Sequence, residues 1–289
     1  MIASFKEVKC SNIEFSVYQK CLMTSSAPHV IPDDNADVKK AMKEKNALFA
    51  SYITEYDCKS STAWWFCVKD DEYDISKLKA KQRYEITKGR RNFYVEQINP
   101  ADYEEQIYEI DKKKFAEYPV QYRPKMKSTA HEHVSGIILE HRRIFGLFDR
   151  NSAELKGYYV CGEKYFPCVQ LLSTGIDPST YKENSSAAIV DGILTYYQSL
   201  SEECYLSDGA RNVRHITQYQ VYLCKNFGFR YVYCKMKMVY PFAIKLVVKM
   251  LKPFKTLLLK SKNPLLYNVG CVMKMDDYSK LSMRGETDV

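Results

Sequence analysis

Hydrophobic and polar positions follow their clearest pattern between residues 205 and 240, where they predict strand, loop, helix, turn and strand in succession. The first strand covers Cys204–Leu206. Apolar residues recur at helical spacing after His215, and Gly228 is expected to end that helix in a left-handed cap. The alternating run 229–240 predicts a long strand. This stretch is the part of the chain that the pattern defines best.

The same pattern predicts further elements upstream. Strands are expected at 13–18, 62–69, 93–98, 143–148, 155–161 and 166–175, and helices at 36–49, 77–89, 103–115, 129–140 and 184–197. Gly89 is expected to stop the helix that begins near Lys77. Three consecutive strands without a helix between them indicate an antiparallel meander. The order therefore predicts an α+β architecture around one central sheet.

The amino-acid composition indicates a folded, globular protein. Its 289 residues, of which 46% are hydrophobic and 27% charged, are ordinary for a globular protein and exclude wholesale disorder. The first ten residues contain no apolar run typical of a signal peptide, and no stretch offers the roughly 20 uncharged apolar residues of a membrane span. A cytosolic location is expected, with the inner face of the membrane as a possible place of attachment.

Cysteine and histidine spacing favours structural thiols over a metal site. The ten cysteines include no CxxC pair and lie mostly in apolar strings, which predicts reduced, buried thiols. His131 and His133 lie two residues apart without a third ligand nearby in sequence. We therefore expect no metal.

The net charge of +8 is concentrated in two segments. Residues 77–91 hold seven Lys or Arg against Glu85, and residues 225–262 hold ten Lys or Arg without Asp or Glu. Such segments can face phosphates, an acidic carrier protein, nucleic acid or anionic lipid, or they can be solvated helix faces. Within the second segment a basic amphipathic helix is expected just after Tyr240, which can lie on an anionic membrane or pack on the domain.

The order of elements from 93 to 240, with the Phe227-Gly228-Phe229 turn closing the last helix, resembles the GNAT superfamily of acyl-CoA-dependent N-acyltransferases. FemAB-like aminoacyl transferases are close cousins that share the fold. The resemblance implies a GNAT-like central mixed, mostly antiparallel sheet flanked by helices. It divides the chain into an N-terminal accessory region (1–92), an acyltransferase domain (93–240), and a basic C-terminal helix with a tail (241–289).

The resemblance also implies a coenzyme A site for acetyl-CoA or another acyl-CoA. GNAT proteins bind the pyrophosphate with a loop of pattern [RQ]xxGx[GA], and Lys182-Glu183-Asn184-Ser185-Ser186-Ala187 stands at that place. Lys182 adds a cation, whereas Ser185 replaces the glycine. A helix N-cap at Asn184 or Ser185 explains the same residues. The cofactor-binding candidates are Gln170, Leu171, Leu172, Ser173, Lys182, Asn184, Ser185, Ser186 and Ala187, the first four through backbone N–H groups on a splayed strand.

The tyrosine that often protonates the leaving thiolate in GNAT enzymes is absent, because Cys224 stands four residues before Gly228. A polar stripe on the same predicted helix, joined by acidic residues at strand ends, supplies other acids and bases. The catalytic candidates are His215, Tyr219, Tyr222, Asp208 and Glu163. Aromatic and polar side chains suited to a sugar acceptor lie elsewhere. The substrate-binding candidates are Trp64, Tyr118, Gln121, Tyr122 and Arg123.

Together these features predict an N-acyltransferase that moves an acyl group from acyl-CoA, or from an acidic acyl carrier protein, to an amine of a sugar or cell-envelope precursor. The basic segments favour a second possibility, aminoacyl transfer from tRNA. A third possibility is a non-catalytic GNAT-like module that docks a partner or an anionic membrane, since fold alone does not fix function.

Overall fold

The computed structural model describes residues 6–10, 12–18, 20–33, 35–118, 120, 123–214 and 218–284. The chain divides into two compact units and passes between them several times. The first unit contains Val68–Asp208 and Val221–Phe229, and the second contains Ser4–Cys67, Gly209–Gln220 and Arg230–Val289. The units thus combine segments far apart in sequence, whereas the division at 92/93 and 240/241 runs along the chain and stays a prediction.

The first unit is built on strands in the order β10-β9-β8-β7-β6. The strands are β6 (Phe93–Gln97), β7 (Arg142–Asp149), β8 (Leu155–Tyr165), β9 (Cys168–Ile176) and β10 (Tyr205–Ala210), the last of which ends in the second unit. In the described part of this sheet, β9 and β10 pair in parallel, whereas β6 to β9 are antiparallel neighbours. The meander expected from the three consecutive strands is present as β7, β8 and β9.

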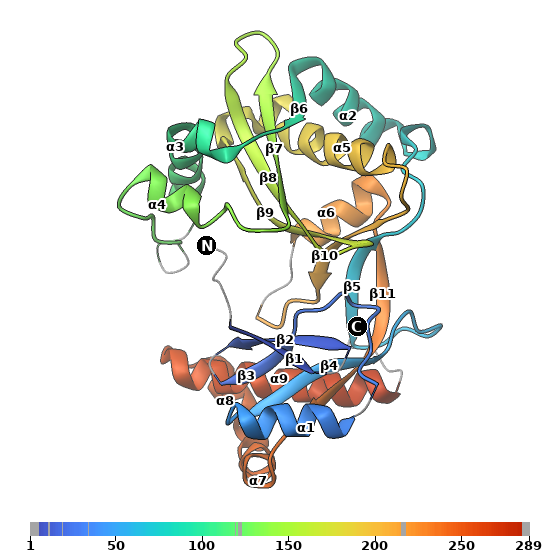
Figure 1. The fold of residues 1–289 in the computed structure, drawn as a ribbon, viewed down its shortest axis with the longest axis vertical. Coiled ribbons are helices and arrows are strands. Elements are labelled where there is room, and N and C mark those ends of the chain that lie inside the picture. Colours follow the sequence, from blue (N-terminus) through green and yellow to red (C-terminus); the bar gives the residue numbers. More distant parts are fainter. Residues whose placement is uncertain are drawn as a thin grey trace. The chain divides into compact units, whose positions relative to one another are not determined.

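Helices cover both faces of this sheet (Figure 1). They are α2 (Ala80–Asn92), α3 (Glu104–Ala116), α4 (Ala130–Ser135), α5 (Ser185–Gln198) and α6 (Gln218–Phe227), with 3₁₀ turns at Ile75–Lys77, Pro100–Tyr103 and Pro178–Glu183. The α3 and α4 side packs an apolar core that includes Ile107, Val134 and Phe148. On the opposite face α5 packs so closely that a Cβ on Gly192 would lie 2.6 Å from the Val95 Cβ.

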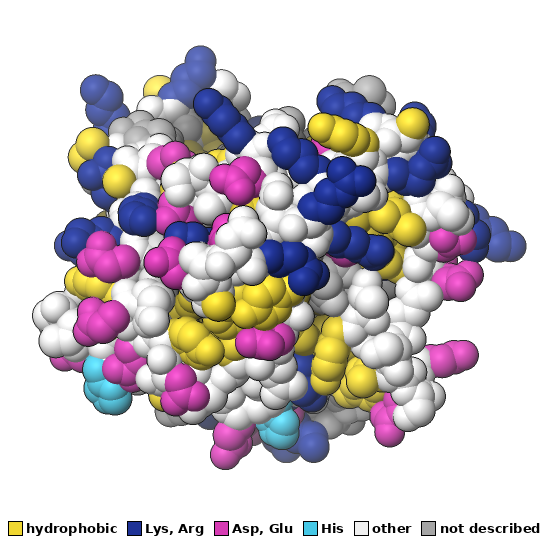
Figure 2. Space-filling view, turned by 90° about the horizontal axis from the view of Figure 1, so that it is seen from above, with side chains coloured by type: hydrophobic (Ala, Val, Ile, Leu, Met, Phe, Trp, Pro, Cys, Tyr) yellow, Lys and Arg dark blue, Asp and Glu magenta, His cyan; other side chains and the backbone are white. Residues whose placement is uncertain are grey.

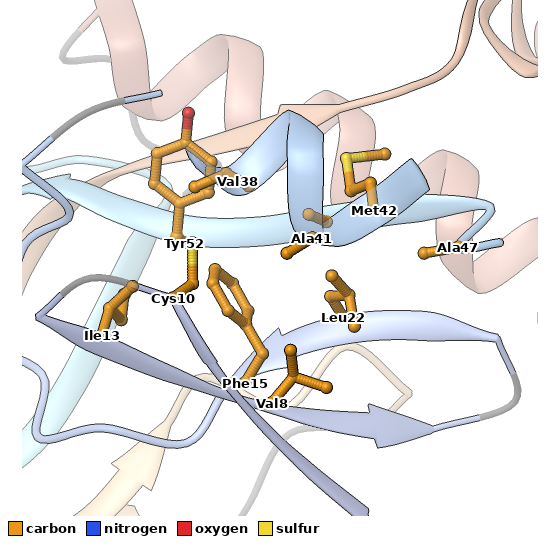
Figure 3. Packing of buried hydrophobic residues seen from close by; sticks show 11 residues of the cluster. Val8, Cys10, Ile13, Phe15, Leu22, Val38, Ala41, Met42, Ala47 and Tyr52 are labelled. Atoms are coloured by element: carbon orange, nitrogen blue, oxygen red, sulfur yellow. The ribbon is translucent and has the colours of Figure 1, made fainter. Parts of the chain in front are cut away.

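The second unit has the strand order β1-β2-β3-β4-β11-β5. Its elements are β1 (Lys6–Cys10), β2 (Ile13–Tyr18), β3 (Cys21–Thr24), α1 (Asn35–Glu44), β4 (Phe49–Glu55), β5 (Trp64–Lys69), β11 (Arg230–Val239), α7 (Phe242–Leu251), a 3₁₀ turn (Lys252–Phe254), α8 (Lys255–Leu259) and α9 (Pro264–Arg284). Figure 3 shows its core, in which Phe15 and Leu22 of the strands meet Val38 of α1. Antiparallel pairing of β4 with β11 joins the two ends of the chain in this unit.

Four predicted helices differ from the observed ones. The helix expected at 36–49 ends at Glu44, and Phe49 instead begins β4. The helix expected to stop at Gly89 continues to Asn92. Gly89 has a packing role instead, because a Cβ on this residue would lie 2.8 Å from the Asn184 carbonyl oxygen. The glycine thus permits close packing of α2 on α5. The helix expected at 129–140 ends at Ser135. The basic helix after Tyr240 is interrupted near Pro253, because proline cannot supply the backbone N–H that a continuous helix needs.

Candidate functional site

In the first unit, strands β9 and β10 pair over only part of the length of β9. Pairing between β10 and β9 covers Cys168–Gln170, whereas β9 continues to Ile176. Just past this point Val160 and Cys161 of β8 pair with Ser173 and Leu171, so Leu172 is an extra residue that forms a β-bulge. A bulge bends its strand and redirects backbone groups, and bulges are frequent beside active sites. The predicted splay around Gln170–Ser173 agrees with this geometry, and its role in binding stays a prediction.

Lys114 of α3 reaches the part of β9 that pairs with β8 but not with β10. Its Nζ donates a hydrogen bond to the carbonyl oxygen of Thr174. Burial lowers the pKa of this amine below its ordinary value, while the nearby Asp111 carboxylate acts in the opposite direction. An amine with a lowered pKa is more readily neutral, and a neutral lysine can accept a proton from a substrate.

A buried carboxylate near Lys114 contacts two further polar side chains. Asp111 is 3% exposed, and its Oδ2 accepts hydrogen bonds from Tyr158 Oη at 2.7 Å and shares one of 2.7 Å with His133 Nε2. Burial and then the Asp111 charge raise the pKa of Tyr158. Gly175 of β9 borders the same carboxylate, since a Cβ there would lie 2.6 Å from Asp111 Oδ1. Four elements thus meet at one polar cluster, which we call the Asp111 cluster (Asp111, Lys114, His133 and Tyr158).

The segment after α3 lies next to this cluster. Tyr118 packs edge-on against Phe115, and Arg123 donates hydrogen bonds to the Ala116 and Tyr118 carbonyl oxygens at 2.8 and 3.3 Å. The Phe115 ring in turn packs against the His133 ring, with centroids 6.4 Å apart. Gln121 and Tyr122 lie outside the described residues. The arrangement places two of the predicted acceptor residues beside the Asp111 cluster, and their substrate role stays a prediction.

The predicted phosphate loop forms the start of α5. Asn184 adopts a left-handed conformation with φ of 63° and makes no side-chain cap, while Lys182 is exposed and Ser186 and Ala187 are in the first turn. Ser185 is fully buried, and its hydroxyl has no hydrogen-bond partner among the described residues. That hydroxyl does not point to solvent, so any phosphate here would depend on backbone N–H groups and cations.

The α2 helix lines this start of α5 with polar contacts. Lys88 Nζ donates to the Lys182 carbonyl oxygen at 2.8 Å, and Asn92 Nδ2 donates to the Glu183 carbonyl oxygen at 3.2 Å. Two lysines therefore lie near the helix N-terminus, where the helix dipole already favours an anion. The residues present suit a phosphate group, without distinguishing coenzyme A from another phosphate-bearing donor.

The predicted acids and bases have different surroundings. Glu163 accepts hydrogen bonds from Arg143 Nε at 2.6 Å and Tyr197 Oη at 2.8 Å, which fixes the carboxylate at the end of β8. Tyr222 of α6 packs edge-on against Phe227, and burial raises the pKa of its phenol. Asp208 lies on β10 in the first unit, beyond the three residues that pair with β9.

Two further candidates belong to the second unit. Tyr219 lies in the first turn of α6, and Trp64 begins β5. The Trp64 side chain is 6% exposed and packs against the Tyr278 ring with centroids 6.5 Å apart. His215 lies outside the described residues. The roles of all these residues stay predictions.

The Asp111 cluster was not among the sequence candidates, although one signal for it exists. Asp111 and Lys114 occupy the same helical face as Ile107 and Ile110, where a charged residue interrupts an otherwise apolar stripe. Charged residues are rarely buried unless they are paired. Such an interruption therefore indicates a partner in another element, but it does not identify that partner. Among the described residues no three His, Cys, Asp or Glu side chains gather as a metal site.

Asp177 links α3 to the turn before α5, and its carboxylate is expected to make stability depend on pH. Its carboxylate accepts hydrogen bonds from Lys113 Nζ at 2.6 Å and the Ser179 N–H at 3.0 Å. Burial opposes ionisation, but these contacts outweigh it and lower the pKa of Asp177. Asp177→Ala is expected to reduce the free energy of unfolding by about 1–2 kcal/mol at pH 7, mostly through loss of the cap, since Lys113 is half exposed.

The sign of the pH effect follows from the lowered pKa. The contribution of the carboxylate is present above its ordinary pKa in the unfolded chain, about 4, and is lost as the pH falls through the lower folded value. Urea unfolding should therefore show the difference between Asp177→Ala and the parent shrinking at pH 3 and below. A difference that stays constant down to about pH 2 would show that the charge of Asp177 does not contribute.

Comparisons with solved structures identify the fold. The C-terminal DUF2156 domain assigned to a lysylphosphatidylglycerol synthetase from Agrobacterium fabrum aligns with a TM-score of 0.53 and 8% identity, over 86% of this chain and 89% of that one. L-PGS from Bacillus licheniformis aligns with a TM-score of 0.50 and 10% identity, over 86% and 87%. FemX aligns with a TM-score of 0.54 and 7% identity, over 82% and 85%.

At these identities the likeness is one of fold. The chain has a GNAT-like α+β fold of the kind shared by FemAB-like proteins, as the order of its elements predicts. No protein-family model and no curated protein matches its sequence. Its function is therefore argued from its own residues.

Proposed function

We propose that this chain is an acyltransferase that moves an aminoacyl group from an ester on a nucleic acid, such as aminoacyl-tRNA, to the amine of a cell-envelope precursor. The observation that carries the proposal is the set of exposed Lys and Arg side chains on α2, the helix that contacts the start of α5. We call this set the basic surface of α2. The name of one similar structure, a lysylphosphatidylglycerol synthetase, also describes an aminoacyl product and supports this class.

The basic surface of α2 is longer than a pyrophosphate requires. Lys81 and Arg91 are exposed on the helix, Lys79 is exposed at its N-cap, and Lys88 contacts the turn before α5. A helix of 13 residues spans about 20 Å, which corresponds to several phosphates of a nucleic acid strand. Figure 2 shows Lys and Arg side chains gathered on the side of the molecule where Figure 1 draws α2. This length favours nucleic acid over coenzyme A as the donor.

The site supports the chemistry of such a transfer in three steps. The attacking amine loses a proton to the neutral Lys114 amine, and its nitrogen forms a bond to the ester carbonyl carbon. Backbone N–H groups at the β9 bulge donate hydrogen bonds to the oxyanion that develops. The C–O bond to the ribose then breaks, and the proton held by Lys114 passes to the departing oxygen. Asp111 holds the ammonium form of Lys114 electrostatically, while Tyr158 and His133 fix the carboxylate.

Binding measurements test the donor directly. Fluorescence anisotropy should show aminoacyl-tRNA binding that weakens linearly on a log–log plot against salt concentration. The triple variant Lys79→Gln/Lys81→Gln/Arg91→Gln should reduce the slope of that plot by about 2–3, because each phosphate contact contributes roughly 0.7–0.9. Lys39→Gln/Lys40→Gln/Lys43→Gln on α1 removes the same charge from exposed positions of the other unit and should leave the slope nearly unchanged.

The acyl-CoA prediction is tested on the same protein by calorimetric titration with acetyl-CoA and longer acyl-CoAs. Saturable acyl-CoA binding, together with tRNA binding that the α2 triple variant does not weaken, would overturn the nucleic acid proposal. Release of free tRNA only when an amine acceptor is added would support it. If the protein bound aminoacyl-tRNA but transferred no aminoacyl group, the proposed catalytic role of Lys114 would be wrong. The assignment of nucleic acid as the donor would still hold.

A further inference from the structure

Helix α7 of the second unit exposes most of its apolar side chains. Phe242 is 86% exposed and Met250 66% exposed, and Leu246 and Val247 lie at about half exposure. Among the residues of α7, only Val248 is buried. A contiguous apolar surface of this kind is unusual on a soluble protein and indicates a binding surface. Figure 1 shows α7 projecting from α8 and the rest of its unit.

The side chains of α7 fall into three sectors around the helix axis. With about 100° per residue, the packing sector contains Ile244, Val248 and Leu251. The second sector contains Lys245 and Lys249, roughly 100° further around. The exposed apolar side chains form the third sector, which borders the lysines and points away from the packing sector. The helix thus has a separate apolar stripe in addition to the one that holds it on the protein.

The charges beside this stripe are of one sign. Among the described residues no carboxylate lies within ion-pair distance of Lys245 or Lys249, and residues 225–262 contain no Asp or Glu at all. By contrast, Lys252 and Lys255 pair with Asp277 of α9 at 2.7 and 2.6 Å. The latter two hold the end of α7 and the start of α8 on the unit, so they have a structural role that the first two lack.

We propose that α7 docks this protein on the surface of an anionic lipid bilayer. The helix lies in the plane of the headgroups with Phe242, Leu246 and Met250 in the acyl-chain boundary and Lys245 and Lys249 among lipid phosphates. The charge argues for lipid over a second copy of the chain, because a second α7 would bring the same lysines together and would supply no carboxylates. Beyond α7, Leu257 and Leu265 are also exposed, at 70% and 75%.

Vesicle flotation of the full chain tests this proposal. Binding is expected to vesicles of phosphatidylglycerol and phosphatidylcholine and to be at least tenfold weaker to pure phosphatidylcholine. Lys245→Gln/Lys249→Gln should weaken binding to the anionic vesicles about 20- to 30-fold, since each lysine near a charged surface contributes roughly fivefold. Phe242→Ser/Met250→Ser should weaken binding to both kinds of vesicle, because apolar insertion does not depend on lipid charge.

The matched control is Lys39→Gln/Lys40→Gln on α1, which removes two exposed charges from the same unit and should change binding less than threefold. Equal binding by the α7 and α1 variants would overturn the proposal. So would sedimentation showing that the parent protein dimerises and that Phe242→Ser/Met250→Ser is monomeric without any loss of vesicle binding. Unchanged thermal unfolding of the exposed-site variants establishes that a loss of binding is not a loss of fold.

Discussion

Replacing Lys114 with methionine is expected to lower the turnover number for aminoacyl transfer by about 100-fold or more, because general-base catalysis contributes at least that much where a positioned amine accepts the proton. Lys114 donates to the Thr174 carbonyl oxygen in the part of β9 that β10 leaves unpaired. Burial lowers the pKa of the amine, so the rate should rise with pH along a limb whose apparent pKa is below the ordinary lysine value. Single-turnover measurements across pH with aminoacyl-tRNA and an amine acceptor check both expectations.

The neighbouring Lys112 provides the matched control. It lies two residues earlier on α3, is exposed and pairs only weakly with Glu109 in solvent, so Lys112→Met should keep the rate within about twofold of the parent. If Lys114→Met kept both the rate and the pH limb, the lysine would serve only to hold β9. If it lost rate but kept the limb unchanged, another group would be the base. Donor binding should persist in both variants, since neither residue belongs to the α2 surface.

The order of elements was predictable because local periodicity dictates it. The apolar spacing of α5 places Ile189, Ile193 and Tyr197 on one face, and each of them is buried. Gly228 takes the left-handed conformation expected of a helix end, with φ of 73°. In such segments the local pattern and the tertiary packing agree, so sequence alone is sufficient.

Long-range pairing was not predictable in the same way. The first 60 residues give weak signals because β1, β2 and β3 are short and because β4 pairs with β11, which follows about 180 residues later. Gly89 is an example at a single residue, because its role depends on a distant segment. A glycine within a polar helix predicts the end of that helix, whereas here the close approach of α5 accounts for the glycine.

The Asp111 cluster could not be predicted from local sequence patterns. A sequence motif, such as one for a phosphate loop or a catalytic tyrosine, identifies residues that are adjacent in sequence. The Asp111 cluster draws its side chains from α3, α4 and β8, so no short motif contains it. Bulge formation at Leu172 depends on the register between β8 and β9, which no pattern within β9 specifies. The sequence therefore suggests a splayed strand, whereas the polar cluster beside it is defined only by the tertiary packing of α3, α4 and β8.

Gly175→Ala is expected to destabilise the protein by roughly 2.5–6 kcal/mol, the largest effect we expect from adding a single methyl group. An added Cβ would lie 2.4 Å from Tyr158 Cε1 and 2.6 Å from Asp111 Oδ1, and neither group has space to retreat. Overpacking of this kind costs about 1–3 kcal/mol. Separating Tyr158 from the buried carboxylate adds about 1.5–3 kcal/mol, since a hydrogen bond to a charged group is weakened. Urea unfolding at pH 7 measures the sum.

Gly136→Ala is the matched control, because the same methyl group there would meet only the His133 carbonyl oxygen at 3.5 Å, an ordinary contact. Its free energy of unfolding should stay within about 0.5 kcal/mol of the parent. Tyr158→Phe combined with Gly175→Ala separates the two contributions. The double variant should be less destabilised than the sum of the two single variants, because both remove the same hydrogen bond. Strict additivity would mean that the alanine methyl does not act through Tyr158 and Asp111.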